Sequence, residues 1–272
     1  MRVLKPTTLD EALAMLASSP APLTPIAGGT DLFVSWHQRP HDDVQLLDLS
    51  GLRELQSLKL ADDYLQLGGL TTYWDVMSSR QFSAAFPLLT EAARQVGAIQ
   101  IQTRGTWAGN IANASPAADG VPVLMAYEAV VTLQSRRGTR DVPLDEFYLG
   151  YKQTARRPDE LIVAIRMARR ARRTEFFHKV GARAAQAIAK LGVAGVRDDQ
   201  GWRIVANSVA PYVCRCRNLE GALNAGRAFV SPDEIAEVLR GDIHPIDDIR
   251  STAEYRQRVL SRILFFRFTA PS

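Results

Sequence analysis

Two glycine-rich segments contain the residues best suited to binding a charged ligand. The first, AGGTDL, spans residues 27–32, and the second, RGTWAGN, spans residues 104–110. Because glycine has no Cβ, the main chain of such a loop can approach a phosphate closely, and main-chain amides that open into a helix attract an anion. Thr30 and Thr106 add hydroxyl donors. These residue types predict that both loops contact phosphate.

The presence of two such loops favours a bound cofactor over a phosphate substrate. A single AGG turn is most often only a turn, but a dinucleotide has one diphosphate that two loops can hold from two sides. The two loops lie about 75 residues apart. Asp119 follows the second loop, and its carboxylate suits the hydroxyls of a ribose or ribityl chain rather than a phosphate.

Residues for other common reactions are missing or poorly arranged. His37 and His41 have the i, i+4 spacing of paired metal ligands, but Pro40 between them breaks the helix that would align their rings. Cys214 and Cys216 lack the two-residue spacer of a zinc knuckle or redox pair. The sequence contains no G-x-S-x-G, Walker or G-x-G-x-x-G motif. We therefore expect no metal site and no side chain that acts as a catalytic nucleophile or general acid.

The composition is that of a globular chain large enough for two domains. The chain has 272 residues, of which 46% are hydrophobic, and no apolar run approaches the roughly 20 residues that span a bilayer. Asp10 and Glu11 lie where a signal peptide needs an uninterrupted apolar stretch, so we expect a cytoplasmic protein. Two cysteines are too few for a disulfide framework or for an iron-sulfur cluster, which normally uses four cysteine ligands.

Arginine supplies most of the positive charge. The net charge of +4 reflects 28 arginines and five lysines against 29 acidic residues. A dense run, IRMARRARRTEF, contains Arg166, Arg169, Arg170, Arg172 and Arg173. A nucleic-acid interface would combine such a run with stacking aromatic residues or a known reader motif, and neither is present. We expect a solvated linker or a subunit contact between two domains.

Hydrophobic periodicity places the first loop between a strand and a helix. Thr8 and Glu11 form a capping box ahead of a helix that runs to Ser18, LTPI predicts a strand, and TDLFVSWHQ predicts a helix that ends before Pro40. VQLLDLS predicts a further strand. Hairpins are expected around Asp62–Asp63 and around Arg137–Gly138.

The middle and C-terminal parts predict a mixed α+β protein. Residues 72–97 predict two helices, whereas residues 99–122 contain too many turn-forming residues for a regular element. ELIVAIRM and EFFHKV predict strands on either side of the arginine run, where we expect a change of domain. Two further strands joined at 198–201 precede three helices, in RNLEGALNA, SPDEIAEVLRG and STAEYRQRVLSRILFFRF.

Four motifs in the same order resemble a known family. They are AGGTDL, QIQTRGTWAGNIANASPAADGVPVL, FYLGYKQTARRPDELIVAI, and FFHKVGAR followed by VAPYVCRCRNLEGAL. Together they make the chain similar to the FAD-binding medium subunit of the molybdenum hydroxylases, the group that contains carbon monoxide dehydrogenase and xanthine dehydrogenase. The resemblance implies an FAD-binding domain of the vanillyl-alcohol-oxidase (PCMH) type at 1–173, with subdomains at about 1–57 and 58–173. A smaller α+β domain like the C-terminal domain of the carbon monoxide dehydrogenase flavoprotein is implied at 174–272.

The resemblance also implies a set of FAD contacts. Asp119 matches an acidic contact, Ile162 or its neighbour Leu161 an apolar main-chain contact on the flavin side, and Lys179 a lysine near the cofactor. The two loops contribute Pro25, Ile26, Ala27, Gly28, Gly29, Thr30, Asp31, Leu32, Thr106, Trp107, Ala108, Gly109 and Asn110.

Three positions depart from the family pattern. Ala108 replaces the first of two glycines found in many relatives, which is acceptable if its φ is negative. Trp107 replaces a small aliphatic residue and would shield the flavin or change its access to an oxidant. Residues 185–187 replace side chains that are often acidic in relatives, which weakens any partner contact inferred there.

The function implied is electron transfer through FAD. The chain would receive electrons from the 2Fe-2S clusters of a small partner subunit, beside a large molybdopterin subunit, in a heterotrimer or its dimer. NAD, a quinone, ferredoxin or oxygen would accept the electrons. The alternatives are a self-contained flavin oxidase or dehydrogenase, and a scaffold subunit that has lost its flavin site and docks through the arginine run.

Overall fold

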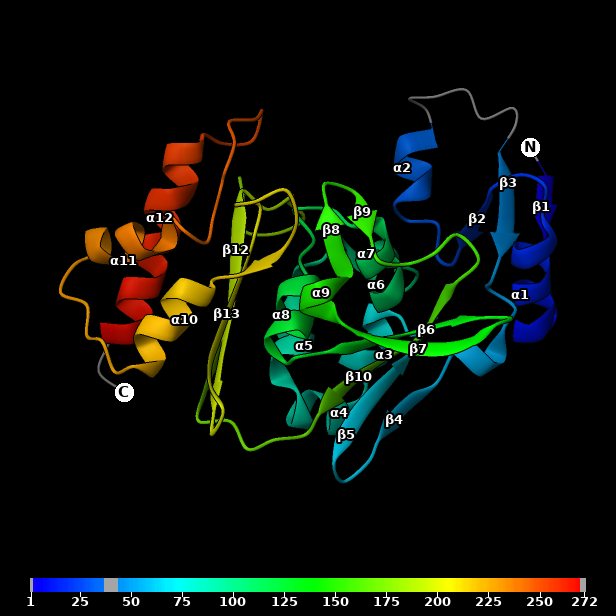
Figure 1. Cartoon of the computed structure of the whole chain (residues 1–272), viewed down its shortest axis with the longest axis horizontal. Helices are drawn as coiled ribbons and strands as arrows, with labels where there is room; N and C mark the ends of the chain where they lie inside the picture. Colours follow the sequence, from blue (N-terminus) through cyan, green and yellow to red (C-terminus); the bar gives the residue numbers. More distant parts are fainter. Residues whose placement is uncertain (1, 37–43, 270–272) are drawn as a thin grey trace.

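Three main β-sheets organise residues 2–36 and 44–269, the parts of the chain described by the computed structural model. The chain passes through the sheets in order, from the N-terminal strands at the right of Figure 1 to the C-terminal helices at the left. The mixed α and β composition confirms the predicted fold class. His37 and His41 lie outside the described residues. None of the helices in the described ranges has the length and hydrophobicity needed to cross a bilayer.

The first sheet has three short parallel strands in the order β1-β3-β2. Helix α1 joins the first two strands, and the hydroxyl of Thr8 caps it by accepting a hydrogen bond from the Glu11 amide at 3.2 Å. The Glu11 carboxylate bonds Thr7 instead of closing the predicted capping box at Thr8. The elements are β1 (Arg2–Leu4), α1 (Leu9–Ser18), β2 (Leu23–Ile26), α2 (Leu32–Trp36), β3 (Gln45–Asp48) and a single 3-10 turn, η1 (Arg53–Leu55).

The second sheet has five antiparallel strands in the order β4-β5-β10-β6-β7. Its two hairpins lie where the sequence predicted them, and β10 occupies the centre. The strands are β4 (Leu58–Leu60), β5 (Tyr64–Gly68), β6 (Val130–Ser135), β7 (Gly138–Pro143) and β10 (Leu161–Ala168). A short helix and ribbon connect β7 to β10, formed by α9 (Leu144–Phe147), β8 (Tyr148–Gly150) and β9 (Gln153–Thr154).

Six short helices pack beside the second sheet, and they correct two predictions. They are α3 (Tyr73–Ser78), α4 (Arg80–Ala85), α5 (Pro87–Gln95), α6 (Ile99–Gln102), α7 (Trp107–Asn113) and α8 (Val121–Ala126) in the described chain. Three helices rather than two occupy residues 72–97. The prediction that residues 99–122 lack regular structure was wrong, because their turn-forming residues mark the ends of short helices. Gly120 precedes α8, and Ala114 ends α7 with a φ of 49°.

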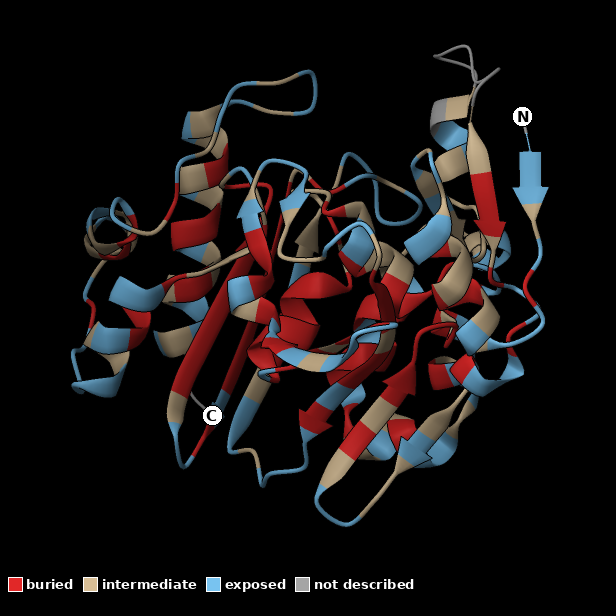
Figure 2. Cartoon of the chain, turned by 45° about the vertical axis from the view of Figure 1, so that its right-hand side comes forward, coloured by how far each residue is buried: buried red, intermediate tan, exposed pale blue. Residues whose placement is uncertain are grey.

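Helices pack on both faces of the third sheet. Its antiparallel strands are β11 (Thr174–Val180), β12 (Leu191–Asp198), β13 (Gly201–Asn207) and β14 (Cys214–Arg215). Side chains alternate, so Ala194 and Val205 join the core around α8, whereas Val193 and Ile204 face the C-terminal helices. Those helices are α10 (Arg217–Asn224), α11 (Pro232–Leu239) and α12 (Ala253–Thr269). Figure 2 shows buried residues continuing from the central helices into β12 and β13.

The arginine run connects β10 to β11, and two of its members bridge the second and third parts of the chain. The Arg172 guanidinium lies over the rings of Phe86 and Tyr127, 4.7 and 5.0 Å from their centroids. It also forms an ion pair with Glu175 at 2.9 Å, and its side chain is only 13% exposed. Arg172 is therefore an internal contact, whereas Arg169 and Arg173 are exposed, as expected for a solvated linker.

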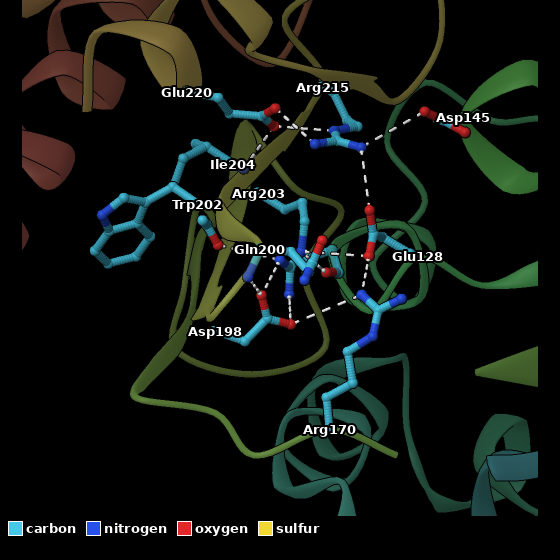
Figure 3. Close-up of polar contacts among 12 residues, drawn as sticks. Glu128, Asp145, Arg170, Asp198, Gln200, Trp202, Arg203, Ile204, Arg215 and Glu220 are labelled. Carbon is cyan, nitrogen blue, oxygen red and sulfur yellow. Dashed lines mark hydrogen bonds and ion pairs between the residues drawn. The ribbon is translucent and has the colours of Figure 1, made fainter. Parts of the chain in front are cut away.

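A network of ion pairs extends from the arginine run into the third sheet (Figure 3). Arg170 contacts Glu128 at 2.5 Å and lies 3.8 Å from Asp198. Arg203 holds Asp198 through two hydrogen bonds of 2.6 Å, and both side chains are at most 5% exposed. Arg215 extends the network to Glu128 at 3.8 Å.

Candidate functional site

A cavity of about 640 Å³ lies where the first two parts of the fold meet the third. Its volume falls in the range of about 300 to 1,000 Å³ that is typical of ligand and cofactor sites. The loop after β2 forms one wall, the stretch from Gly105 to Asp119 forms another, and Leu161 and Ile162 contribute the start of β10. Residues 186–188 and Arg250 close the side nearest the C-terminal part.

The first loop presents main-chain amides to this cavity. Gly29 has a φ of +73°, the left-handed conformation that glycine adopts without strain. The amides of Gly28, Gly29, Thr30 and Asp31 have no hydrogen-bond partner among the residues described. Successive unpaired amides around a left-handed residue form a concave anion-binding site. The predicted phosphate loop therefore has the main-chain geometry that a phosphate requires.

The two glycine-rich loops touch each other. A Cβ built on Gly28 would lie 1.8 Å from the main-chain oxygen of Arg104 and 3.1 Å from the Gly105 nitrogen. The sequence predicts that the glycines of this loop, Gly28 included, lack a Cβ so that a phosphate can approach the main chain. The structure corrects this, because here the missing atom is needed for the contact between the loops.

The second loop is fixed by hydrogen bonds on both sides. The Thr106 hydroxyl caps α7 by accepting a hydrogen bond from the Gly109 amide at 2.9 Å, and its own proton stays available to donate. The Trp107 amide donates to the Thr71 oxygen at 3.1 Å. Ala108 lies inside α7 and is not among the residues with positive φ, so the alanine fits without strain.

Asp119 and Lys179 form a buried ion pair at the cavity wall. The Lys179 Nζ lies 2.7 Å from Asp119 Oδ2 and donates to the Gln95 main-chain oxygen at 2.8 Å. Burial raises the pKa of Asp119 to about 6, and the Lys179 ammonium opposes this rise.

Two buried oxygen atoms at this wall have no hydrogen-bond donor among the described residues, Asp119 Oδ1 and Asn110 Oδ1. A buried acceptor without a donor is costly, so both atoms suit a ligand that carries hydroxyl groups. This agrees with the ribose or ribityl role predicted for Asp119.

The predicted site residues are almost all gathered here. Those that line the cavity are Pro25, Ile26, Ala27, Gly28, Gly29, Thr30, Asp31, Leu32, Thr106, Ala108, Gly109, Asn110, Asp119, Leu161 and Ile162. Trp107 and Lys179 are not among the described residues that line the cavity. The Trp107 ring is fully buried against Tyr73 at 4.8 Å between centroids, so its position does not match the expected role as a flavin shield.

Sequence reasoning missed several lining residues. They include Tyr73, Asn113, Arg156, Glu160, Ile188 and Arg250. Arg156 and Glu160 fall inside a motif that we quoted for the resemblance, but nothing in their spacing marks them as cavity residues. Gln186 and Ala187 were noted only as departures from the family pattern, and they also line the cavity.

The cysteines are not reactive thiols. Burial raises the pKa of Cys214 to about 12 and raises that of the fully buried Cys216 well above its ordinary value. No group of His, Cys, Asp or Glu within the described ranges could hold a metal ion.

Comparison with known proteins identifies the family. Residues 1–168 match the family described as the FAD binding domain in molybdopterin dehydrogenase. The chain belongs to this family. Membership makes FAD its cofactor and places the chain among the oxidoreductases.

Individual relatives extend the match over nearly the whole chain. The xanthine dehydrogenase FAD-binding subunit of Escherichia coli O157:H7 is 29% identical over 262 residues, which cover 93% of this chain and 89% of that protein. The carbon monoxide dehydrogenase medium chain of Hydrogenophaga pseudoflava is 29% identical over 266 residues, covering 95% and 92%. A solved structure of carbon monoxide dehydrogenase from the same organism matches with a TM-score of 0.88 at 29% identity, over 98% of this chain and 95% of that chain.

The cavity walls fit FAD. The unpaired amides of the first loop suit the diphosphate, and the unpaired oxygens of Asn110 and Asp119 suit hydroxyls of the ribityl chain or ribose. The resemblance stated from the sequence is thus confirmed at the level of family and cofactor.

Proposed function

We propose that this chain is the electron-transfer subunit of a multi-subunit molybdenum hydroxylase. When bound, FAD supplies the redox chemistry, accepting electrons from one partner and passing them to another. The observation that carries the proposal is a cavity built from two touching glycine loops in a chain of the FAD-binding family.

In this proposal each wall has a defined task. The Gly28–Asp31 amides bind the diphosphate, Asn110 and Asp119 accept hydrogen bonds from hydroxyls, and the Leu161–Ile162 main chain contacts the flavin side. Gly69, which also lines the cavity, packs closely on this segment, since an added Cβ there would lie 2.3 Å from the Ile162 oxygen. Lys179 holds the Asp119 carboxylate in place from behind.

The proposed partners are a small subunit with 2Fe-2S clusters and a large molybdopterin subunit. Relatives are named as subunits or medium chains of dehydrogenases, which supports a place in a complex. Two cysteines are too few for a cluster on this chain, so in this proposal the clusters that deliver the electrons lie on another polypeptide. NAD, a quinone, ferredoxin or oxygen is the proposed acceptor.

We further propose residues 1–173 as the FAD-binding domain, with subdomains at about 1–57 and 58–173, and 174–272 as the C-terminal domain. The change from the first to the second sheet at β4, and from the second to the third at β11, supports these boundaries.

Expression of the full chain with and without its neighbouring reading frames tests the proposal. We expect a yellow protein with flavin absorbance that co-purifies with an iron-sulfur and a molybdenum subunit. A colourless chain that takes up no FAD on reconstitution would instead support the scaffold. If the isolated chain reduced its flavin with an organic substrate and no partner, the self-contained oxidase or dehydrogenase would replace our proposal.

A further inference from the structure

Most of the charges on the FAD cavity wall are paired. Among the described residues, five charged side chains line the cavity, and three of them form a close ion pair. The pairs are Asp119 with Lys179 at 2.7 Å, Glu160 with Arg140 at 2.7 Å, and Arg250 with Asp248 at 3.3 Å. Asp31 lies only in the field of Lys152, and the Arg156 guanidinium lies only in the fields of Glu160 and Asp159.

Arg156 has no carboxylate partner in the part of the chain that the structure describes. Its Nη1 donates to the main-chain oxygens of Arg157 at 3.1 Å and Glu160 at 2.8 Å. These two bonds fix the guanidinium, and only the longer-range fields of Glu160 and Asp159 act on its charge. Partial burial lowers the pKa of Arg156, although a guanidinium stays protonated at neutral pH.

The Glu160 carboxylate is already bound by other donors. Both oxygens of Glu160 accept hydrogen bonds from Arg140, at 2.7 and 2.8 Å, and Oε2 also accepts one from the Arg157 amide at 2.7 Å. The Glu160 side chain is only 3% exposed. The Nε and Nη2 groups of Arg156 form no hydrogen bond within the described chain, so this lining residue has donors available to a ligand.

We propose that Arg156 binds a phosphate group in this cavity, supplied either by FAD or by a dinucleotide electron acceptor. The inference rests on the proposed function, because it requires such a molecule in the cavity. Two of the three carboxylates of the wall already have a close cationic partner, and the first-loop amides contribute only partial charges. An anionic diphosphate therefore finds at Arg156 a full positive charge that no close ion pair of the described chain engages, and the planar fork of the guanidinium matches phosphate oxygens.

Arg156→Met removes the charged guanidinium and keeps an unbranched apolar stem, and Arg157→Met is the matched control. Arg157 is the adjacent residue, is 57% exposed and does not belong to the described lining of the cavity. Each variant of the full chain is stripped of flavin and titrated with FAD and with riboflavin, with flavin fluorescence as the readout. Circular dichroism and a melting curve establish that both variants fold.

We expect Arg156→Met to weaken FAD binding by roughly 10- to 100-fold, the size of one charge-assisted hydrogen bond. Riboflavin binding, which involves no phosphate, should stay unchanged in the same variant. Arg157→Met should bind FAD within about twofold of wild type, as expected for an exposed charge. The salt dependence of FAD binding should become shallower for Arg156→Met, and Arg156→Lys should recover part of the affinity.

A second measurement distinguishes the two sources of phosphate. The FAD-loaded chains are assayed for dye reduction by NADH. If FAD affinity is unchanged but the KM for NADH rises about tenfold or more only for Arg156→Met, the bound phosphate belongs to the acceptor. If FAD affinity falls, the phosphate belongs to the cofactor.

Two combined results overturn the proposal. In both, Arg156→Met and Arg157→Met have the same FAD affinity. In the first they also have the same KM for NADH, and in the second neither variant nor wild type oxidises NADH. An equal loss of FAD and riboflavin binding would also overturn it, since that result indicates a structural role. Failure of wild type to bind FAD at all is a separate outcome, because it refutes the proposed function itself.

Discussion

At the scale of single residues, Asp119 carries a charge in a place that disfavours it. Its folded-state pKa of about 6 lies above the ordinary 3.8, because burial outweighs the attraction of Lys179. Between pH of about 4 and 6 the folded chain therefore binds this proton more tightly than the unfolded chain does. The contribution of Asp119 to the free energy of unfolding falls as pH rises through that window.

Asp119→Asn removes this titration. We compare the free energies of unfolding of wild type and variant. The difference, wild type minus variant, should decrease by up to about 3 kcal/mol between pH 4 and 6.5. Urea unfolding of the flavin-free chains at several pH values measures it. A difference that stays constant over this range would contradict the raised pKa.

Gly28 gives a second prediction at this scale. In Gly28→Ala the new Cβ would overlap the Arg104 carbonyl, and two main-chain segments must separate to make room. We expect a loss of about 2–4 kcal/mol in the free energy of unfolding and a large loss of FAD occupancy.

Gly51→Ala is the control for Gly28→Ala. An added Cβ at Gly51 meets no atom of the described chain within 4 Å, and the φ of Gly51 is not in the left-handed region. This control should unfold within about 0.5 kcal/mol of wild type in the same urea titration. Equal stability of the two variants would show that the loops do not touch.

At the scale of elements, strands were easier to predict than helices. The two hairpins of the second sheet are predicted around Asp62–Asp63 and Arg137–Gly138 from a purely local signal. Helices α6 to α8 span only one or two turns, too few for a helical period to stand out. Their boundaries consist of Gly105, Ala114 and Gly120, which we interpreted as a continuous loop.

The site was predictable to the extent that its chemistry is local. The glycine loops and Asp119 follow from residue types, whereas Lys179 came only from the family resemblance. Arg156 and Arg250 reach the cavity from segments 94 residues apart in sequence. No local pattern states which distant elements meet, so neither could be recognised before the structure.

The ion pair between β12 and β13 should stabilise the third sheet far more than a surface pair does. Arg203 and Asp198 are both at most 5% exposed, so Arg203→Met leaves a buried carboxylate without its main partner. We expect a loss of about 3–5 kcal/mol in the free energy of unfolding, measured with urea.

The control for Arg203→Met is Arg137→Met, which breaks the ion pair with Asp159 at an arginine that is 64% exposed. It should cost at most about 1 kcal/mol. Similar losses for the two variants would mean that burial does not determine the strength of these pairs.

At the scale of the whole molecule, the FAD-binding family segment is not an independent unit. The core around α8 includes Phe177, Val196 and Val205, which all lie beyond residue 168, where the family match ends. Removing them would expose the apolar face of α8 to water.

A fragment of residues 1–168 should therefore aggregate or bind a hydrophobic dye strongly, unlike the full chain. Size-exclusion chromatography and dye fluorescence measure this. A monodisperse fragment that holds FAD as tightly as the full chain would show that the shared core is dispensable.

The contact between Gly28 and Arg104 also bears on the order of events during biogenesis. The two loops pack directly against each other, so the conformational entropy of bringing segments more than 70 residues apart together is lost when the polypeptide folds. Little of that entropy is left to lose when FAD enters, which favours fast and tight capture. The subunit can thus complete its fold first and acquire its flavin afterwards, without FAD as a template for folding.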